Sequence, residues 1–190
     1  MDTSFLSKKQ ITSIGFKKVG KNIKISKVAR FYNPEFISMG DNVRIDDFCI
    51  LSGAIEIGSY IHIAAYSSLY GRGGIVLKDF SGLSARVTVY SATDDYSGNY
   101  LTNPTVPEKY SNVFISRVII EKHVIVGAGS VILPGVILHE GSAIGAMSLV
   151  KDSMPEWMIC VGIPAKPVKK REKTIIELEK ELLLQTMNES

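Results

Sequence analysis

The sequence is poor in cysteine, histidine and tryptophan, and it has no long apolar segment. Two cysteines, three histidines and one tryptophan occur among its 190 residues. Two cysteines cannot form a disulfide framework or a cysteine-rich zinc site, and no metal-ligand spacing is visible. The longest apolar run, residues 124–138, is shorter than a membrane span and is interrupted by glycine and proline. We therefore expect a cytoplasmic protein with no bound metal, no stable membrane insertion and no secretion signal.

The chain also lacks a strong excess of either charge. Its 22 lysines and arginines and 19 aspartates and glutamates give a net charge of +3. Binding to nucleic acid through phosphate neutralisation needs a denser basic surface, so we expect no nucleic-acid partner. An apolar fraction of 45% and a charged fraction of 22% are typical of one folded domain with small appendages.

Aliphatic residues are plentiful, and they recur at every sixth position in two phased runs. The runs are Met39, Ile45, Leu51, Ile57, Ile63 and Leu69, and then Ile120, Val126, Ile132, Leu138, Ile144 and Val150. A period of six is neither the helical period nor plain strand alternation. Short strands joined by tight turns, with the aliphatic side chains inward, explain it. The spacing therefore predicts a solenoid of β-coils that bury their faces against one another.

Three segments carry a resemblance to a known family. Residues 126–136 (VGAGSVILPGV), 144–150 (IGAMSLV) and 161–166 (VGIPAK) resemble the last coils of the hexapeptide-repeat acyltransferases, especially the galactoside and xenobiotic acetyltransferase branch. The resemblance covers roughly residues 20–170. It implies an all-β fold, a left-handed parallel β-helix, with acetyl-CoA as co-substrate. It also implies a homotrimer whose active sites are shared between subunits.

The chain divides into three predicted parts. Residues 1–19 form an N-terminal helical segment, residues 20–168 form the β-helix, and residues 169–190 form a C-terminal helix. Ser7 and Gln10 have the spacing of a capping box, and Gly15 is placed to end the first helix. The repeat fails in residues 91–116, which we interpret as an ordered loop that completes the active site of a neighbouring subunit, as the resemblance implies.

The C-terminal segment has the pattern of an amphipathic helix. Its apolar positions are Ile175, Leu178, Leu182 and Leu183, and its polar positions include Glu177, Glu179, Lys180 and Glu181. We expect the apolar face to pack on the solenoid or on a partner subunit.

The predicted catalytic residues are Asp94, Asp95 and His123. The family supplies a histidine as general base where the long loop begins, and this chain has Asp94 at that position. Asp94 and Asp95 are equally compatible with an Asx turn that starts the loop. His123 is the reserve candidate for the base, and a solvated surface histidine is the alternative interpretation.

The predicted co-substrate site follows from the resemblance. Ala128 and Ala146 match positions whose backbone meets the pantetheine arm, and Lys166 and Lys169 are candidates for the phosphates of coenzyme A. Lys151 is a further candidate for co-substrate binding. The alternatives are small turn residues and a solvated charge run that starts the C-terminal helix.

The predicted acceptor site lies on the coils before the loop. Tyr66 and Tyr70 are candidates to stack on a sugar or base, and Arg72 and Arg86 to bind a nucleotide diphosphate. Ordinary surface positions on the coils are the alternative.

The missing histidine favours an amine acceptor. A carboxylate is a poor base for an alcohol, whereas an amine is a stronger nucleophile that needs to lose only one proton. We therefore predict N-acetylation of a nucleotide-linked amino sugar for a surface polysaccharide, as in lipopolysaccharide O-antigen or capsule biosynthesis. O-acetylation of a sugar hydroxyl is the alternative, and a non-catalytic scaffold or binding subunit is a third hypothesis.

Overall fold

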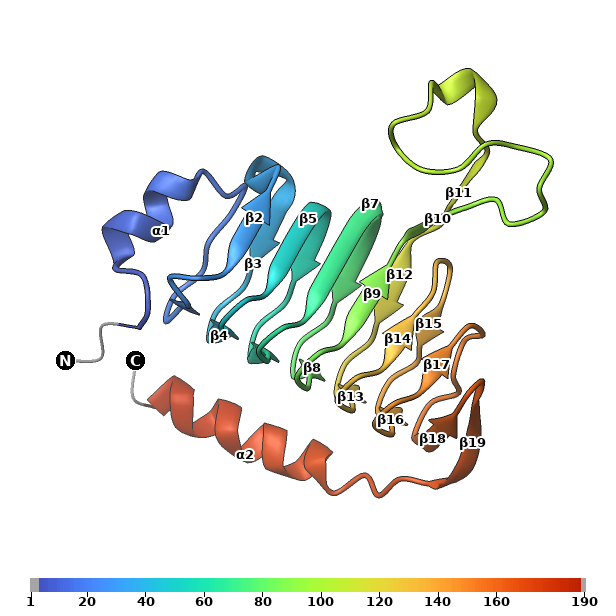
Figure 1. Ribbon diagram of the computed structural model, residues 1–190. Coiled ribbons are helices and arrows are strands. Elements are labelled where there is room, and N and C mark those ends of the chain that lie inside the picture. Colours follow the sequence, from blue (N-terminus) through green and yellow to red (C-terminus); the bar gives the residue numbers. More distant parts are fainter. Residues whose placement is uncertain (1–3, 189–190) are drawn as a thin grey trace.

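The chain folds into a β-solenoid with one long loop and a helix at each end (Figure 1). The computed structural model describes residues 4–188, so the outer limits predicted for the two terminal segments lie outside the described residues. The helical elements are α1 (Lys8–Ile14), η1 (Pro34–Phe36), η2 (Glu108–Tyr110) and α2 (Ile175–Asn188). The strands before the loop are β1 (Lys24–Ile25), β2 (Arg30–Tyr32), β3 (Ile37–Met39), β4 (Val43–Ile45), β5 (Ile50–Ile57), β6 (Ile61–Ile63), β7 (Ser68–Leu77), β8 (Gly82–Leu83) and β9 (Thr88–Tyr90). Those that follow are β10 (Ala92–Asp94) and β11 (Val113–Ile115) in the loop, then β12 (Val118–Ile120), β13 (Ile125–Val126), β14 (Val131–Ile132), β15 (Ile137–Leu138), β16 (Ala143–Ile144), β17 (Leu149–Val150), β18 (Met158–Gly162) and β19 (Ala165–Lys170).

The six-residue period produces parallel pairing between successive coils. Ile45 pairs with Ile63, so one coil takes 18 residues, or three repeats. Strand β7 pairs with β9 along its first residues and with β12 along its last, which shows that it bends from one face to the next. A separate sheet contains β4, β6, β8, β13 and β16 in that order. Three faces therefore stack coil on coil, as the period predicted.

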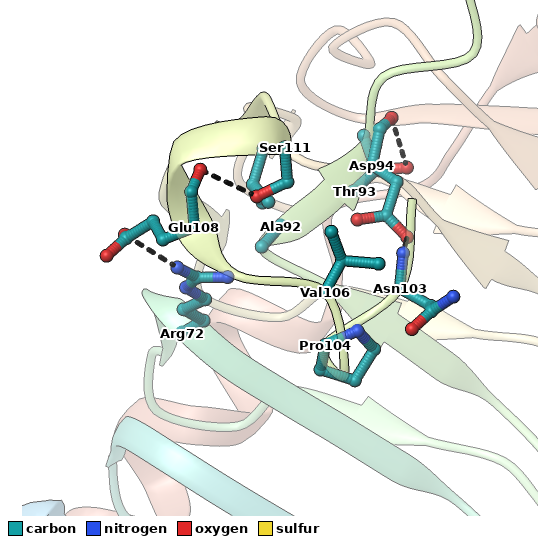
Figure 2. A pocket seen from close by; sticks show the side chains of 10 residues that line it. Arg72, Ala92, Thr93, Asp94, Asn103, Pro104, Val106, Glu108 and Ser111 are labelled. Atoms are coloured by element: carbon teal, nitrogen blue, oxygen red, sulfur yellow. Dashed lines mark hydrogen bonds and ion pairs between the residues drawn. The ribbon is translucent and has the colours of Figure 1, made fainter. Parts of the chain in front are cut away.

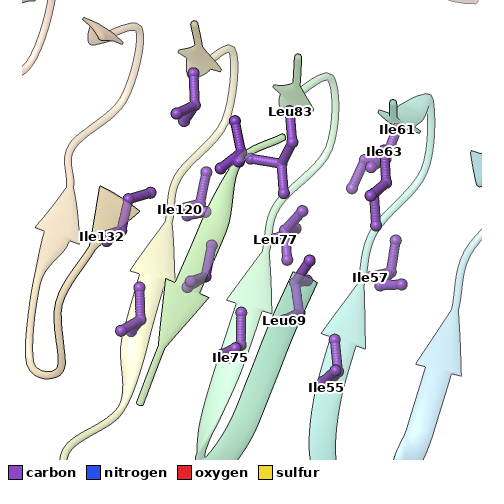
Figure 3. Close-up of a cluster of buried hydrophobic side chains, with 14 of the residues drawn as sticks. Ile55, Ile57, Ile61, Ile63, Leu69, Ile75, Leu77, Leu83, Ile120 and Ile132 are labelled. Carbon is purple, nitrogen blue, oxygen red and sulfur yellow. The ribbon is translucent and has the colours of Figure 1, made fainter. Parts of the chain in front are cut away.

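The aliphatic positions of the repeat fill the interior (Figure 3). In β6, Ile61 and Ile63 are buried while His62 between them is exposed, as expected for alternation within a short strand. Buried hydroxyls close the turns between strands: the Ser67 Oγ donates to the carbonyl of Ser84 at 3.1 Å, and the Ser130 Oγ donates to that of Gly145 at 3.0 Å. The core is thus continuous along the solenoid.

Helix α1 forms as its sequence predicts. The Ser7 side chain accepts from the Gln10 amide, the Gln10 side chain accepts in return from the Ser7 amide at 2.8 Å, and Gly15 ends the helix in a left-handed conformation. Ile11 is buried, so the helix closes the first coil.

The C-terminal helix begins later than predicted. Lys169 and Lys170 belong to β19, which folds back antiparallel on β18, and α2 starts only at Ile175. Pairing with the last coil overrides helical propensity in this segment. The predicted polar face is also wrong at Glu179, which faces the solenoid, while Leu178 is 56% exposed. Within residues 4–188, no helix is long and apolar enough to cross a membrane.

Charged side chains attach α2 to the solenoid. Glu179 binds the Lys122 Nζ at 2.6 Å and the His123 Nε2 at 2.8 Å. Burial acts to raise the pKa of Glu179, but the hydrogen bonds from Lys122 and His123 outweigh it and hold the pKa below its ordinary value of 4.5. The Arg171 guanidinium donates to the carbonyls of His123 and Gly141 at 2.7 and 3.0 Å.

This attachment predicts that α2 loosens in acid. Because the pKa of Glu179 is lowered in the fold, its contribution is complete above pH 4.5 and is lost as the pH falls through the folded pKa. Hydrogen exchange in α2, corrected for intrinsic rates, should therefore rise as the pH falls below 4.5. Glu179→Gln should already show fast exchange at pH 7 and a weaker acid response. Glu177→Gln, an exposed position on the same helix, is the control and should match the wild type.

Candidate active site

A cavity of about 360 Å³ opens at the base of the long loop (Figure 2). Strands β10 and β11 form an antiparallel ribbon that carries the loop away from the solenoid (Figure 1). The cavity lies between this ribbon, the returning loop and the edge of β7. Its lining residues are Arg72, Ala92, Thr93, Asp94, Asn103, Pro104, Val106, Glu108, Ser111 and Val113.

The loop leaves and re-enters the solenoid at one point. The buried Ser91 Oγ donates to the Tyr70 carbonyl at 2.8 Å and accepts from the Gly73 amide at 2.8 Å. The Ser116 amide, at the far end of the loop, donates to the Ser91 carbonyl at 3.0 Å. A Cβ on Gly73 would lie 2.5 Å from that carbonyl oxygen, so only glycine allows this close approach.

Both predicted aspartates lie at the base of the loop, with different contacts. Asp94 lines the cavity, and its Oδ2 accepts from the Asn103 amide at 3.2 Å. Asp95 forms the turn that the alternative interpretation proposed, because its Oδ1 accepts from the Ser97 amide at 2.7 Å. Its Oδ2 accepts from the Asn112 side chain at 2.8 Å. Asp94 is therefore the carboxylate that a ligand in this cavity would meet.

Of the four predicted acceptor residues, one lines the cavity. Arg72 does so, 3.9 Å from Glu108 across the opening. Tyr70 stacks on Tyr90 with ring centroids 5.2 Å apart, and Tyr66 stacks on Phe48 at 4.9 Å. The structure does not bring Tyr66, Tyr70 or Arg86 into the lining of this cavity.

Small residues form a separate edge of the solenoid. Four alanines occupy the same turn position in successive coils, and we call them the alanine edge: Ala65, Ala85, Ala128 and Ala146. The carbonyls of Ala65, Ala85 and Ala128 each accept from an amide of the next coil, as in the bond from the Met147 amide to Ala128 at 2.8 Å. Both predicted pantetheine residues, Ala128 and Ala146, lie here. Sequence analysis did not single out Ala85, which the repeat alignment places in this column, or Ser84, which stands in the preceding column.

The predicted phosphate-binding lysines lie at the end of the solenoid. Lys151 and Lys166 gather around Asp152, at 3.3 and 3.8 Å. Lys169 is exposed on β19, beside Lys170. The group is therefore an exposed basic surface at the last coils and not the start of a helix.

His123 lies in a different place from the other catalytic candidates. It is 6% exposed, its Nε2 is bonded to Glu179, and its ring stacks on Phe80 with centroids 5.5 Å apart. The expectation of a solvated histidine is wrong here, because α2 covers it. His123 does not line the loop cavity, and it lines a groove beside α2.

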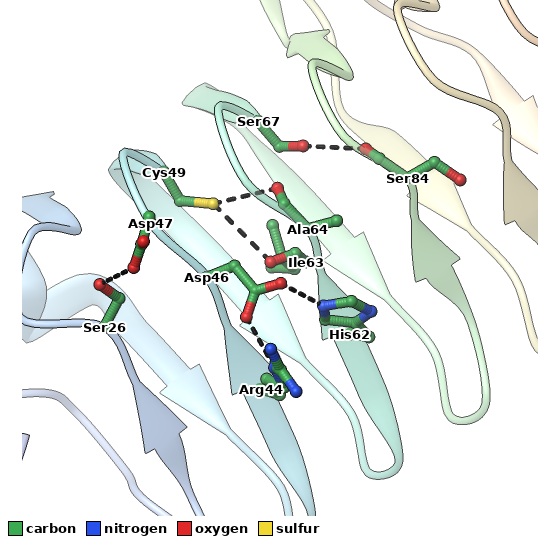
Figure 4. A network of polar contacts seen from close by, with 10 residues as sticks. All are labelled: Ser26, Arg44, Asp46, Asp47, Cys49, His62, Ile63, Ala64, Ser67 and Ser84. Carbon is green, nitrogen blue, oxygen red and sulfur yellow. Dashed lines mark hydrogen bonds and ion pairs between the residues drawn. The ribbon is translucent and has the colours of Figure 1, made fainter. Parts of the chain in front are cut away.

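A polar network occupies the coils near the N-terminal end of the alanine edge (Figure 4). Asp46 binds the Arg44 Nε at 2.6 Å and the His62 Nε2 at 2.7 Å. Burial acts to raise the pKa of Asp46, but these hydrogen bonds outweigh it and lower the pKa. Burial raises the pKa of Cys49 to about 11, so this thiol stays protonated and is no nucleophile. Among residues 4–188, no group of three or more His, Cys, Asp or Glu side chains is arranged to hold a metal ion.

The period-six coil, the alanine edge and the loop with its acidic cavity together define a transferase of the hexapeptide-repeat class. A family model described as bacterial transferase hexapeptide (six repeats) matches residues 117–152. A dTDP-4-amino-4,6-dideoxy-D-glucose acyltransferase of Escherichia coli is 51% identical over 179 residues, 93% of each chain. The chain thus belongs to the hexapeptide-repeat acyltransferase family, and it is an enzyme of this class.

Solved structures agree over nearly the whole chain. The S84C variant of AntD, an N-acyltransferase from Bacillus cereus, in complex with dTDP-4-amino-4,6-dideoxyglucose and coenzyme A, has 53% identity, a TM-score of 0.95, and coverage of 97% of this chain and 100% of that one. Other AntD structures carry replacements of Asp94 (D94A, D94N) and of Ser84 (S84A, S84T). A maltose O-acetyltransferase from Clostridium difficile, at 24% identity and a TM-score of 0.60, covering 91% of this chain and 79% of its own, shares the fold.

Proposed function

We propose that the chain transfers an acyl group from acyl-CoA to the 4-amino group of dTDP-4-amino-4,6-dideoxyglucose or a closely similar dTDP-linked amino sugar. The observation that carries the proposal is Asp94, a carboxylate in the loop cavity where the wider family has a histidine. Both relatives described above are named for this class of acceptor. The amine acceptor expected from the residues is therefore favoured over a sugar hydroxyl and over a scaffold role.

The chemistry needs little from the protein beyond placement and one proton acceptor. The amine nitrogen attacks the thioester carbonyl, a C–N bond forms, and the C–S bond breaks with release of the coenzyme A thiolate. Asp94 orients the amine and takes the proton that the nitrogen loses as its charge becomes positive. Ser84 comes directly before Ala85 of the alanine edge, and AntD has been solved with replacements at residue numbers 84 and 94.

We propose that acyl-CoA lies along the alanine edge. An extended pantetheine arm can use main-chain N–H and C=O groups beside Ala128 and Ala146, as an added strand does. Lys151, Lys166 and Lys169 at the adjacent last coils would meet the phosphates. AntD binds coenzyme A and 3-hydroxybutyryl-CoA, so the acyl group is part of this proposal, with acetyl as the first donor to test.

We further propose a homotrimer in which two subunits build each site. In one chain, the lining of the Asp94 cavity contains no member of the alanine edge. The loop also presents exposed apolar side chains, among them Tyr96 at 90% and Leu101 at 58%. Packing the loop over the alanine edge of a second copy would cover them and bring Asp94 to the donor. Sedimentation analysis should give three times the 20.8 kDa chain mass.

The test is turnover on a matched pair of acceptors. Purified protein is mixed with acetyl-CoA or 3-hydroxybutyryl-CoA and either dTDP-4-amino-4,6-dideoxyglucose or its analogue with a 4-hydroxyl group. Thiol release and product mass should show one acyl group added to the amine and none to the hydroxyl compound. Acylation of the hydroxyl compound alone would overturn the proposal.

The lysine assignment gives a separate prediction. The double variant Lys166→Ala/Lys169→Ala should raise the KM for acyl-CoA about tenfold. Charge-assisted hydrogen bonds contribute roughly 1.5–3 kcal/mol, and the exposure of both lysines places the expected effect at the low end of this range. The KM for the amino sugar should stay unchanged, and the acyl-CoA effect should shrink at high salt. Lys27→Ala, an exposed lysine on an early coil, is the control. An equal rise in both KM values would contradict the assignment.

A further inference from the structure

The loop that carries Asp94 is closed by a side-chain pair just beyond its two-stranded ribbon. Strands β10 and β11 pair Asp94 with Val113, so the antiparallel register places Asp95 opposite Asn112. At this next position the contact is made by side chains, with the Asn112 Nδ2 donating to the Asp95 Oδ2 at 2.8 Å. The second carboxylate oxygen, Oδ1, accepts from the Ser97 amide at 2.7 Å. One carboxylate thereby joins the two arms of the loop.

Asp94 depends on this ribbon for its position. Its own side chain has an exposed hydrogen bond of 3.2 Å from the Asn103 amide. The ribbon below it has three residue pairs, from Ala92 with Ile115 to Asp94 with Val113. An isolated two-stranded hairpin is marginally stable in water, so the contact that closes the ladder beside Asp94 restricts where its carboxylate can lie.

We propose that Asp95 and Asn112 form a clasp that positions Asp94 for the acyl transfer without touching the substrate. The proposal rests on the proposed function and assigns Asp95 a positioning role in place of the catalytic role considered from the sequence. Hydrogen bonds from Ser97 and Asn112 hold the pKa of Asp95 below its ordinary value of 3.8. The carboxylate therefore stays ionised, and the clasp intact, at neutral pH.

The first experiment compares single and exchanged substitutions. Asp95→Ala and Asn112→Ala should each lower kcat about 10- to 100-fold, since small displacements of a reacting group have effects of this size. The KM for acyl-CoA and the melting temperature should change little, because the loop stands outside the solenoid core. The exchange D95N/N112D should recover most of the lost kcat: an amide at position 95 still accepts from Ser97 and donates to a carboxylate at position 112. Asn99→Ala, in the same loop, is the control.

The second experiment separates positioning from a general loss of structure. In an Asp94→Ala background, Asp95→Ala should lower kcat no further, because its effect passes through Asp94. An unchanged kcat for Asp95→Ala in the wild-type background, or an equal further loss in the Asp94→Ala background, would overturn the clasp. Hydrogen exchange in residues 92–95 provides a readout that does not need turnover, and it should rise in Asp95→Ala and fall back in the exchanged pair. If the wild type fails to acylate the amino sugar, the proposed function fails, and this exchange measurement still decides the clasp.

Discussion

Asp94→Asn should lower kcat/KM for the amino sugar by roughly 10²–10⁴-fold, the usual contribution of a positioned proton acceptor. The amide has nearly the shape of the carboxylate, and its Oδ can still accept from the Asn103 amide. What it loses is the negative charge that orients the attacking amine and the ability to take up the proton that its nitrogen loses. Initial rates at saturating acyl-CoA, followed by thiol release, measure the effect.

A second substitution at position 94 distinguishes a catalytic role of Asp94 from a role in anchoring the loop. Asp94→Ala removes the charge and also the bond to Asn103. If Asp94 acts on the substrate, both variants should be slow to a similar degree. If it only anchors the loop, Asp94→Asn should keep most of the wild-type rate and Asp94→Ala should not. Loss of rate in Asp94→Ala alone would thus remove Asp94 from the chemistry.

Ile63→Ala should lower the free energy of unfolding by about 2–5 kcal/mol, the range for truncation of a buried aliphatic side chain. Ile63 is fully buried in β6 and pairs with Ile45 on one side and Leu83 on the other. Each coil of a solenoid touches only its neighbours, so a cavity at this position weakens the interfaces with both adjacent coils. The midpoint and slope of urea denaturation, read by circular dichroism, measure the loss.

Neighbouring and graded substitutions provide the controls for this prediction. His62→Ala changes the adjacent outward side chain and removes an exposed pair with Asp46, so it should lose at most about 1 kcal/mol. Ile63→Val should lose about 0.5–1.5 kcal/mol. Equal losses for Ile63→Ala and His62→Ala would contradict the assignment of inward and outward faces.

The sequence predicted the solenoid well because its signal is periodic and local. Each aliphatic residue of the two runs marks one short strand. A single position that departs from the pattern does not change the six-residue register of the others. The prediction of the C-terminal segment was wrong where that segment packs against the solenoid, because the repeat pattern does not show which residues the solenoid presents there. Lys169 and Lys170 pair with the last coil instead of starting a helix, and Glu179 turns inward because Lys122 and His123 lie beneath it.

The candidate site was only partly predictable for a related reason. Asp94 stands at a position fixed by its distance from the last regular coil, so alignment with the repeat locates it. The cavity around it is made by Asn103, Val106 and Glu108, which return to Asp94 through a non-repeating loop that has no pattern to follow. Ser84 lies in an ordinary turn in the column before the alanine edge, and no feature of its local sequence distinguishes it.

The attachment of both loop ends at Ser91 and Ser116 also bears on how the loop can change between related enzymes. The Gly73 amide and the Ser91 carbonyl fix both ends of the loop. The packing of the neighbouring coils therefore does not depend on the number of residues in the loop. Doubling the length of a flexible loop costs only about 0.6 kcal/mol in closure entropy. If acceptor and donor bind as proposed, we expect that residues 92–115 can be exchanged for another loop, changing the acceptor, while the coils proposed to bind the donor stay as they are.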